Sequence, residues 1–153
     1  MTILTRHLGE IDIDESKIIE FKEGIPGFEG LKSFALFHDE ENGNGEAFMW
    51  LQSLDDTDVT FVLLNTFAFM PQYKPILEDS DISDLGEFGD EDLLIRNIAV
   101  IHDKLENTTV NLKAPIIINA ATKLGKQAIA KNEEYHIRHY IFIGMEITEE
   151  TSA

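Results

Sequence analysis

The sequence predicts an all-β fold, an antiparallel β-barrel-like or sandwich domain of about ten short strands with one short helix. Two observations support this fold class. Apolar residues alternate with polar ones, or form short β-branched and aromatic runs, as strands require. Glycine, proline, asparagine and aspartate recur between these runs as turn signals. At 153 residues the chain is expected to form a single domain over residues 1–153, with a frayed end near 149–153.

The expected strands follow one another at short intervals. They are placed at residues 2–8, 11–13, 18–21, 34–37, 48–53, 60–65, 93–101, 109–112 and 116–118, with a last apolar segment at 140–147. The strand at 60–65 has almost no polar break and is expected to be central. Asn97, inside the longest strand, must be hydrogen-bonded or exposed. Residues 39–46 are predicted to be a hairpin loop and residues 123–126 a turn.

Residues 23–30 carry a dense turn signal that contains three glycines and one proline. Glycine permits a positive φ, and Pro26 biases Ile25 towards an extended conformation. Ile25 and Phe28 are expected to anchor the loop to the core. A structural corner is the favoured interpretation, ahead of a catalytic loop.

Residues 107–119 are expected to form two short strands with a bend between them. Val110 and Leu112 alternate with polar neighbours, which is typical of a half-buried strand. Pro115 cannot donate a ladder hydrogen bond and therefore marks the bend. The unbroken isoleucine run at 116–118 is expected to be covered on both faces.

Acidic residues dominate the first two-thirds of the chain. The net charge is −17, from 29 acidic and 12 basic residues. Residues 1–103 contain 23 of the acids and six of the bases, whereas residues 104–153 contain six of each. The negative electrostatic field of such a chain repels nucleic acid and anionic membranes, and it attracts basic protein surfaces. We therefore expect no direct nucleic-acid or membrane partner. A solvated surface that only maintains solubility is the alternative.

The densest acidic run covers residues 78–92, which contain eight acids and no base. A short helix is expected inside it, with Ser80 or Asp81 as the N-cap and Gly86 after its end. Two interpretations of the run remain open, a solvated acidic face and a docking surface for a basic partner.

Three aromatic residues, Phe67, Phe69 and Tyr73, lie on either side of Pro71. Their alternation places Phe67 and Phe69 on one face. Such residues most commonly belong to the core, but an aromatic cluster beside prolines also lines apolar binding grooves. An alternative function follows from the second interpretation, a small-ligand-binding or hydrolytic β-barrel with an aromatic cavity.

No pattern in the sequence supports a catalytic, cofactor or metal site. The chain has no cysteine, which excludes thiolate ligands and cysteine nucleophiles, and it has no Gly-x-Ser-x-Gly elbow. His136 and His139 would share a face only on a helix, and on a strand they would point to opposite faces, so a surface pair is expected. The carboxylates at 55–58 indicate an acidic turn more than a cation site. We therefore expect no enzymatic activity, no cofactor and no metal.

No apolar run approaches the length of a membrane span, and residues 1–6 lack the apolar region of a signal peptide. A cytoplasmic location is expected, and the absence of cysteine is compatible with it.

Four stretches together resemble the flagellar assembly factor FliW family. They are Glu23–Glu29, Trp50–Ser53, Asn111–Asn119 and Gly125–Gln127. They occur in the order of the family, and the resemblance extends over nearly the whole chain to about His139. It implies a small, non-enzymatic, cytoplasmic β-barrel-like protein that couples flagellin synthesis to flagellum assembly. It also implies two partners bound in turn, flagellin and the translational regulator CsrA, which FliW proteins antagonise.

Ten residues are candidates for partner binding. Three belong to the aromatic stretch and five to the acidic run, and two are the expected exposed contributors of residues 107–119. They are Phe67, Phe69, Tyr73, Glu78, Asp79, Asp81, Asp84, Glu87, Asn111 and Lys113. The glycines and prolines of the shared stretches are expected to be architectural.

Overall fold

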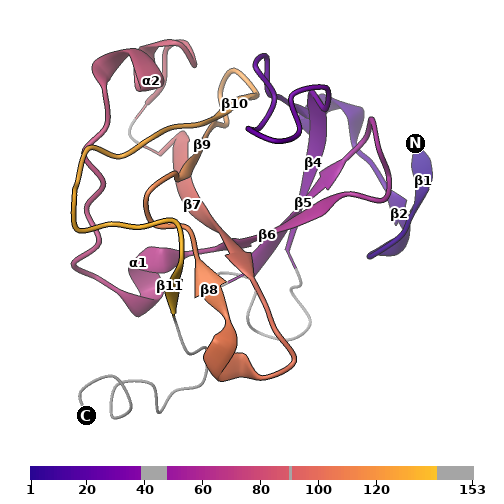
Figure 1. Cartoon of the computed structure of the whole chain (residues 1–153). Coiled ribbons are helices and arrows are strands. Elements are labelled where there is room, and N and C mark those ends of the chain that lie inside the picture. Colours follow the sequence, from indigo (N-terminus) through magenta and orange to yellow (C-terminus); the bar gives the residue numbers. More distant parts are fainter. Residues whose placement is uncertain (39–47, 90, 141–153) are drawn as a thin grey trace.

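The computed structural model describes residues 1–38, 48–89 and 91–140 (Figure 1). The strands in these ranges are β1 (Thr2–Thr5), β2 (Gly9–Asp12), β3 (Ile19–Glu20), β4 (Ser33–His38), β5 (Phe48–Ser53), β6 (Thr60–Leu64), β7 (Leu93–Val100), β8 (Thr109–Val110), β9 (Ile116–Asn119), β10 (Leu124–Gln127) and β11 (His139–Tyr140). The helices are α1 (Thr66–Phe69), α2 (Asp79–Ser83) and the 3-10 turns η1 (Glu15–Lys17) and η2 (Leu105–Asn107). None of these helices is long and apolar enough to cross a membrane.

Seven of the described strands close into a barrel, in the order β7-β6-β5-β4-β3-β10-β9 and back to β7. All of these pairs are antiparallel except β3 with β10, which is parallel and consists of the single pair Leu124 and Glu20. The predicted all-β class is confirmed, in its barrel form. The pairing of β3 with β10 could not be predicted from local periodicity. A contact between one residue of each strand, far apart in the chain, leaves no pattern in the sequence.

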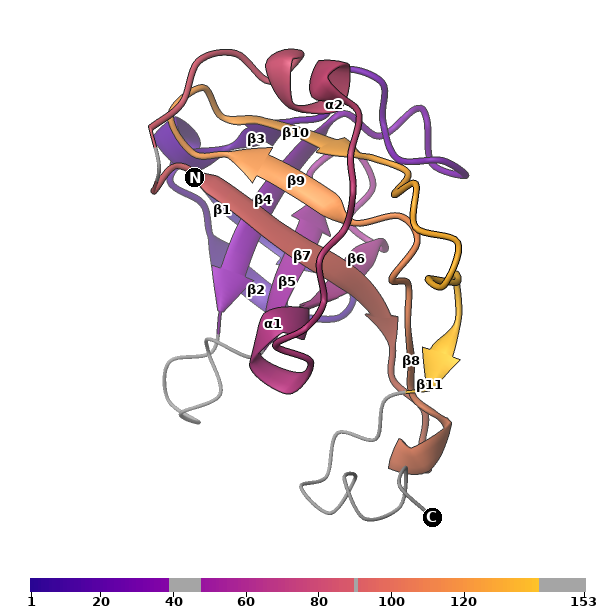
Figure 2. The same cartoon turned by 90° about the vertical axis from the view of Figure 1, so that its left-hand side faces the viewer.

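Along one of its edges, the eight-residue strand β7 pairs with two different strands. Its first half, Leu93–Arg96, pairs with β9, and its end pairs with β8 through Ala99 and Val100. Its other edge pairs with β6. The strands β8 and β9 therefore lie end to end beside β7 (Figure 2). The bend around Pro115 separates them, so the predicted pair of short strands is confirmed.

The isoleucine run of β9 is buried on both faces, as predicted. Ile116 and Ile118 point into the barrel core, where Phe21, Phe34, Leu51 and Leu63 are fully buried. Ile117 points outward into a smaller cluster with Leu85 and Ala128. A strand alternates its side chains between faces, and both faces of β9 are covered, so no polar residue interrupts the run.

The loop at 23–30 is a structural corner, as predicted. Ile25 is buried and forms an isolated bridge with Phe28, and the Phe28 ring meets the Phe61 ring edge-on at 5.1 Å. Gly24 has a φ of +70°, and a Cβ there would lie 2.6 Å from the backbone of Glu29. Both the backbone conformation and the close approach therefore require glycine.

The prediction of a turn at residues 123–126 was wrong. Residues 124–127 form β10, which pairs with β9 and closes the barrel. Gly125, interpreted as a turn signal, is a packing glycine, because a Cβ there would lie 2.5 Å from the Phe21 ring. Glycine inside a strand commonly marks such a close approach.

The expected helix in the acidic run is present as α2, and Gly86 follows it with a φ of +87°. The predicted caps were wrong, because the N-cap is Glu78 and its side chain makes no capping hydrogen bond. A second α-helix, α1, was not predicted. The expected hairpin loop at 39–46, the frayed end at 149–153 and most of the apolar segment at 140–147 lie outside the described residues.

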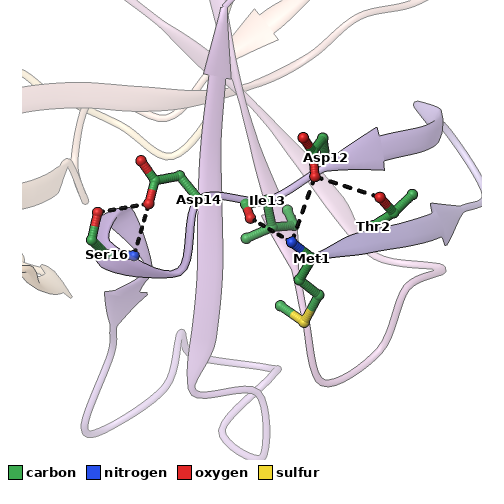
Figure 3. Close-up of polar contacts among 6 residues, drawn as sticks. All are labelled: Met1, Thr2, Asp12, Ile13, Asp14 and Ser16. Atoms are coloured by element: carbon green, nitrogen blue, oxygen red, sulfur yellow. Dashed lines mark hydrogen bonds and ion pairs between the residues drawn. The ribbon is translucent and has the colours of Figure 1, made fainter.

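The β1–β2 hairpin forms its own two-stranded sheet beside the barrel. The Met1 amino group donates to the carbonyl of Ile13 at 3.2 Å and lies 3.6 Å from the Asp12 carboxylate (Figure 3). Asp14 accepts hydrogen bonds from the hydroxyl (2.6 Å) and amide (3.0 Å) of Ser16. These bonds lower the pKa of Asp14 and cap η1.

Candidate partner-binding site

Two lysines form ion pairs with some of the acidic side chains of residues 78–92. Lys126 Nζ lies 3.1 Å from carboxylate oxygens of both Asp81 and Asp84, and Lys131 Nζ lies 3.2 Å from Glu78. Asp81 is half-buried, whereas Glu78, Asp79, Asp84 and Glu87 are exposed. Among the described residues, no ion pair involves Asp79 or Glu87. The run therefore contains acids that are ion-paired to lysines, of which Glu78 and Asp84 are also exposed, and exposed acids outside any described ion pair.

Lys126 fixes α2 to the barrel wall. Burial lowers the pKa of this lysine, but hydrogen bonds to Asp81 and Asp84 outweigh that effect, so the pKa of Lys126 lies above its ordinary value. Its backbone belongs to β10, paired with β9. The acidic helix is thus attached to the rigid part of the fold, which keeps its exposed carboxylates in place.

Asn111 and Lys113 lie in the bend between β8 and β9, and both are half-buried. The Asn111 side-chain oxygen accepts the Ala114 amide at 2.9 Å, and Lys113 Nζ donates to the carbonyl of Asn132 at 2.8 Å. Both residues line a groove of about 340 Å³. Asn107, at the start of the same stretch, is more exposed than either.

The three aromatic candidates pack against other rings. The Tyr73 side chain is 2% exposed, and its ring lies 5.5 Å from Phe67 and 4.9 Å from Tyr135. Phe69 is half-buried, and its ring lies 6.4 Å from Phe48. Phe67 and Phe69 sit on the helical turn α1 and not on a strand, so the alternation predicted for them was wrong. Tyr73 belongs to the hydrophobic core and presents almost no surface to a partner.

A buried polar network braces the bend, and Asn97 is its centre. Asn97 Nδ2 donates to the Asn111 carbonyl at 2.8 Å and to the Tyr73 hydroxyl at 3.0 Å, while Thr66 donates to Asn97 Oδ1 at 2.7 Å. The Tyr73 hydroxyl in turn donates to the Leu112 carbonyl at 2.7 Å. Burial raises the pKa of Tyr73 to about 12, so the hydroxyl remains a donor at neutral pH. The prediction that Asn97 must be satisfied is confirmed.

The histidines form a surface pair, as expected, and their rings lie side by side. The His136 and His139 rings stack at 5.3 Å, with 19° between their planes. Residues 136–138 precede β11, so the opposite-face rule for strands does not apply to the pair. The His136 amide donates to His139 Nε2 at 2.9 Å, and burial together with the neighbouring His136 lowers the pKa of His139. The pair is therefore a structural hydrogen-bonded contact.

The acidic turn at 55–58 supports the backbone. Asp55 accepts the amides of Lys32 (2.6 Å) and Ser33 (2.9 Å), and Asp56 accepts the amide of Asp58 at 3.0 Å. Within the described ranges, no group of three or more potential ligands is placed to hold a metal ion.

The fold and the site define a class of protein, a small β-barrel with an acidic helix held against its wall. Comparisons identify the family. Residues 2–141 match the family described as FliW protein. The flagellar assembly factor FliW of Clostridium novyi (strain NT) is 42% identical over 142 residues, which cover 93% of this chain and 97% of the relative. The FliW of Thermoanaerobacter pseudethanolicus (strain ATCC 33223 / 39E) is 44% identical over 141 residues, covering 92% and 93%.

A solved structure agrees with these sequence matches. The crystal structure of the flagellar assembly factor FliW superposes with a TM-score of 0.83 at 36% identity, and the match covers 95% of this chain and 99% of that one. The chain belongs to the FliW family of flagellar assembly factors. The resemblance seen in the sequence is confirmed.

Sequence reasoning missed two kinds of residue at the site. Lys126 and Lys131 hold the acidic run from about fifty residues away in the chain, and no local pattern indicates such a pairing. Thr66 supports Asn97 from the start of α1. Only Asn97 left a signal, as a polar residue in an apolar strand.

Proposed function

We propose that this protein is a non-enzymatic regulator of flagellum assembly that acts in the cytoplasm and binds flagellin and the translational regulator CsrA in turn. Membership of the FliW family over nearly the whole chain carries this proposal. The relatives are described as flagellar assembly factors, and the acidic charge suits a partner with a basic, RNA-binding surface.

In this proposal the two partners compete for one regulator. Flagellin is held before export, much as a chaperone holds its client, and the protein is then occupied. When secretion removes flagellin, the freed protein sequesters CsrA, and flagellin messenger RNA is translated. Flagellin synthesis is thereby coupled to flagellum assembly.

We assign the electrostatic part of CsrA binding to the solvent-facing acids of the 78–92 run. Asp79, on α2, and Glu87, in the segment after it, are exposed, and no ion pair among the described residues involves either. Asp81 and Asp84 are already engaged by Lys126, and Glu78 by Lys131, so their main role is to position this segment on the barrel. Exposed charges of this kind chiefly accelerate association and contribute less to the lifetime of a complex.

Association kinetics with purified CsrA tests this assignment. The variant Asp79→Asn/Glu87→Gln should associate several-fold more slowly than the wild type at low salt, and the difference should shrink as salt is added. The matched control is Glu10→Gln/Glu15→Gln, which removes the same charge from exposed positions on β2 and η1. Equal rates for the two variants would assign the effect to net charge alone.

The alternative of a ligand-binding or hydrolytic barrel with an aromatic cavity is not favoured by any contact in the aromatic stretch. The rings of Phe67, Tyr73 and Tyr135 fill the space between one another. We therefore propose protein binding as the function.

A further inference from the structure

The barrel closes between β3 and β10 with very little backbone pairing. The two strands share a single pair of residues, Glu20 and Leu124. The chain leaves β3 directly after this pair and turns, and the Gly24 amide donates to the Phe21 carbonyl at 2.9 Å in that turn. β10 continues to Gln127 (Figure 2). Most of β10 therefore has no strand beside it on the β3 side.

The hydrogen bonds around β10 show which of its main-chain groups lack a partner. The amides of Ala128 and Ala130 donate at 3.0 and 2.7 Å to carbonyls of the 113–115 bend, and so continue the register of β10 with β9. Alternate residues of an antiparallel ladder direct their N–H and C=O groups to opposite edges, so those of Gln127 and Ile129 point away from β9. Among the described residues, no hydrogen bond reaches these groups on that side. We call residues 127–129 the open edge.

Two hollows lie between β10 with the open edge and the chain that follows β3. The first has a volume of about 280 Å³, and residues 22–24 and 124–126 contribute to its lining. The second is the groove beside the bend, and Ile25 and Pro26 line it together with Gln127 and Ile129. The two stretches of chain are therefore separated by space where a paired strand would otherwise lie.

Unpaired main-chain groups at alternate residues determine what kind of segment can occupy the open edge. An extended peptide presents N–H and C=O groups with the same repeat and can add as a further strand. A helix uses its main-chain groups internally, so it would leave those of Gln127 and Ile129 without partners. The occupant that satisfies both residues is therefore an extended segment of a polypeptide.

The two hollows indicate the side chains of that segment. Lys126 and Gln127 point to opposite faces of β10. The hollow that Lys126 lines contains charged side chains of both signs, which are Lys22, Glu23, Asp84 and Lys126. The groove that Gln127 lines contains mostly apolar side chains, among them Ile25, Phe28 and Ile129. A strand added at the open edge should therefore alternate polar with apolar residues.

We propose that the open edge binds an extended, alternately apolar and polar segment of a protein partner as an added β-strand. The main chain of the segment pairs with Gln127 and Ile129, and its apolar side chains enter the groove beside the bend. This inference rests on the proposed function as a protein-binding regulator, and it adds the site and the mode of binding.

Residue-resolved amide hydrogen exchange of the full chain, alone and with purified flagellin or CsrA, tests the inference. In the protein alone, the amides of Gln127 and Ile129 should exchange much faster than those of Ala128 and Ala130, which donate within the protein. In the complex with the partner that supplies the strand, exchange at Gln127 and Ile129 should slow by about tenfold or more, because their amides then donate to the added strand.

A pair of substitutions at one position separates backbone pairing from side-chain contact. Ile129→Pro removes the side chain and the unpaired N–H, whereas Ile129→Ala removes the side chain and keeps the N–H. The proline variant should bind the partner about tenfold more weakly than the alanine variant, since proline cannot donate to an added strand. Melting curves show whether both variants fold, and if Ile129→Pro does not, hydrogen exchange of the wild type decides alone. Equal affinities of two folded variants would overturn the inference.

The outcomes also distinguish this inference from the proposed function. If either partner binds and exchange at Gln127 and Ile129 stays as fast as in the protein alone, the inference fails while the proposed function stands. Slow exchange in the protein alone would equally overturn it, because another segment of this chain, or a second copy if the protection depends on concentration, would then occupy the open edge. If neither flagellin nor CsrA binds, the proposed function fails and the inference fails with it.

Discussion

Asn97 allows β7 to be shared by two partner strands. Where β8 ends and before β9 begins, the ladder beside β7 is interrupted, and the Asn97 side chain bonds the Asn111 carbonyl there. Tyr73 bonds the next carbonyl, that of Leu112. A buried polar group must have a partner, and here two side chains replace the missing ladder bonds.

Removal of the Tyr73 hydroxyl should therefore destabilise the protein. Tyr73→Phe leaves the buried Leu112 carbonyl without its donor, which costs about 1–3 kcal/mol of unfolding free energy. Urea denaturation measures the change. Tyr140→Phe is the control, because the Tyr140 side chain is 73% exposed and the same substitution there should change stability by less than about 0.5 kcal/mol. Equal effects at the two positions would show that the Tyr73 hydroxyl contributes nothing to stability.

His139 makes a pH-dependent contribution. Its pKa in the folded protein lies below the ordinary value of 6.5, so the unfolded chain binds the proton more readily. The contribution is complete above pH 6.5 and is lost as the pH falls through the folded pKa. Melting temperatures recorded from neutral pH downward should therefore decrease less steeply in His139→Gln, which does not titrate and still offers an acceptor to the His136 amide. Parallel curves for variant and wild type would contradict this assignment.

At the residue scale, the sequence predicted burial and hydrogen bonding correctly where the type of a single side chain indicates its environment. The isoleucines of β9 indicated burial on both faces, and Asn97 indicated a need for partners. It failed for Phe67 and Phe69, because the helical turn α1 lies on the barrel and its ring contacts come from Tyr73 and Phe48. Those ring contacts depend on the tertiary packing of α1, which residue spacing in the sequence does not indicate.

Among the elements, β10 closes the barrel through a glycine. Gly125 faces the Phe21 ring, and the strand pairs with β9 on one side and β3 on the other. The sequence indicated most of the other barrel strands, because alternation and apolar runs are local signals. It missed β10 because glycine is far more common in turns than in strand interiors.

A methyl group at position 125 should therefore damage the closure. In Gly125→Ala, the Cβ would lie 2.5 Å from two Phe21 ring carbons and 3.1 Å from Ile19, so we expect a loss of about 1–3 kcal/mol, as for other overpacked cores. Gly30→Ala is the matched control, since no atom lies within 4 Å of a Cβ there. The midpoints of urea denaturation compare the two, and similar midpoints would argue against a packing role for Gly125.

At the scale of the whole molecule, our account assigns the electrostatic part of recognition to the unpaired acids of the 78–92 run. The acidic run was visible in the sequence, but its division into paired and free acids was not, because Lys126 and Lys131 approach it from far along the chain. The groove beside the bend left no signal in the sequence. Its walls come from the 23–30 loop, from β6 and β7, and from residues near 113, 129 and 137, which only the closed barrel brings together.

Calorimetric competition with CsrA and flagellin from the source organism tests the central claim most directly. At low salt, the protein should release or absorb heat with each partner alone, and added salt should weaken the CsrA interaction. Prior saturation with flagellin should abolish the CsrA signal. The absence of heat with both partners at low salt, or undiminished CsrA binding to the flagellin-saturated protein, would contradict the account.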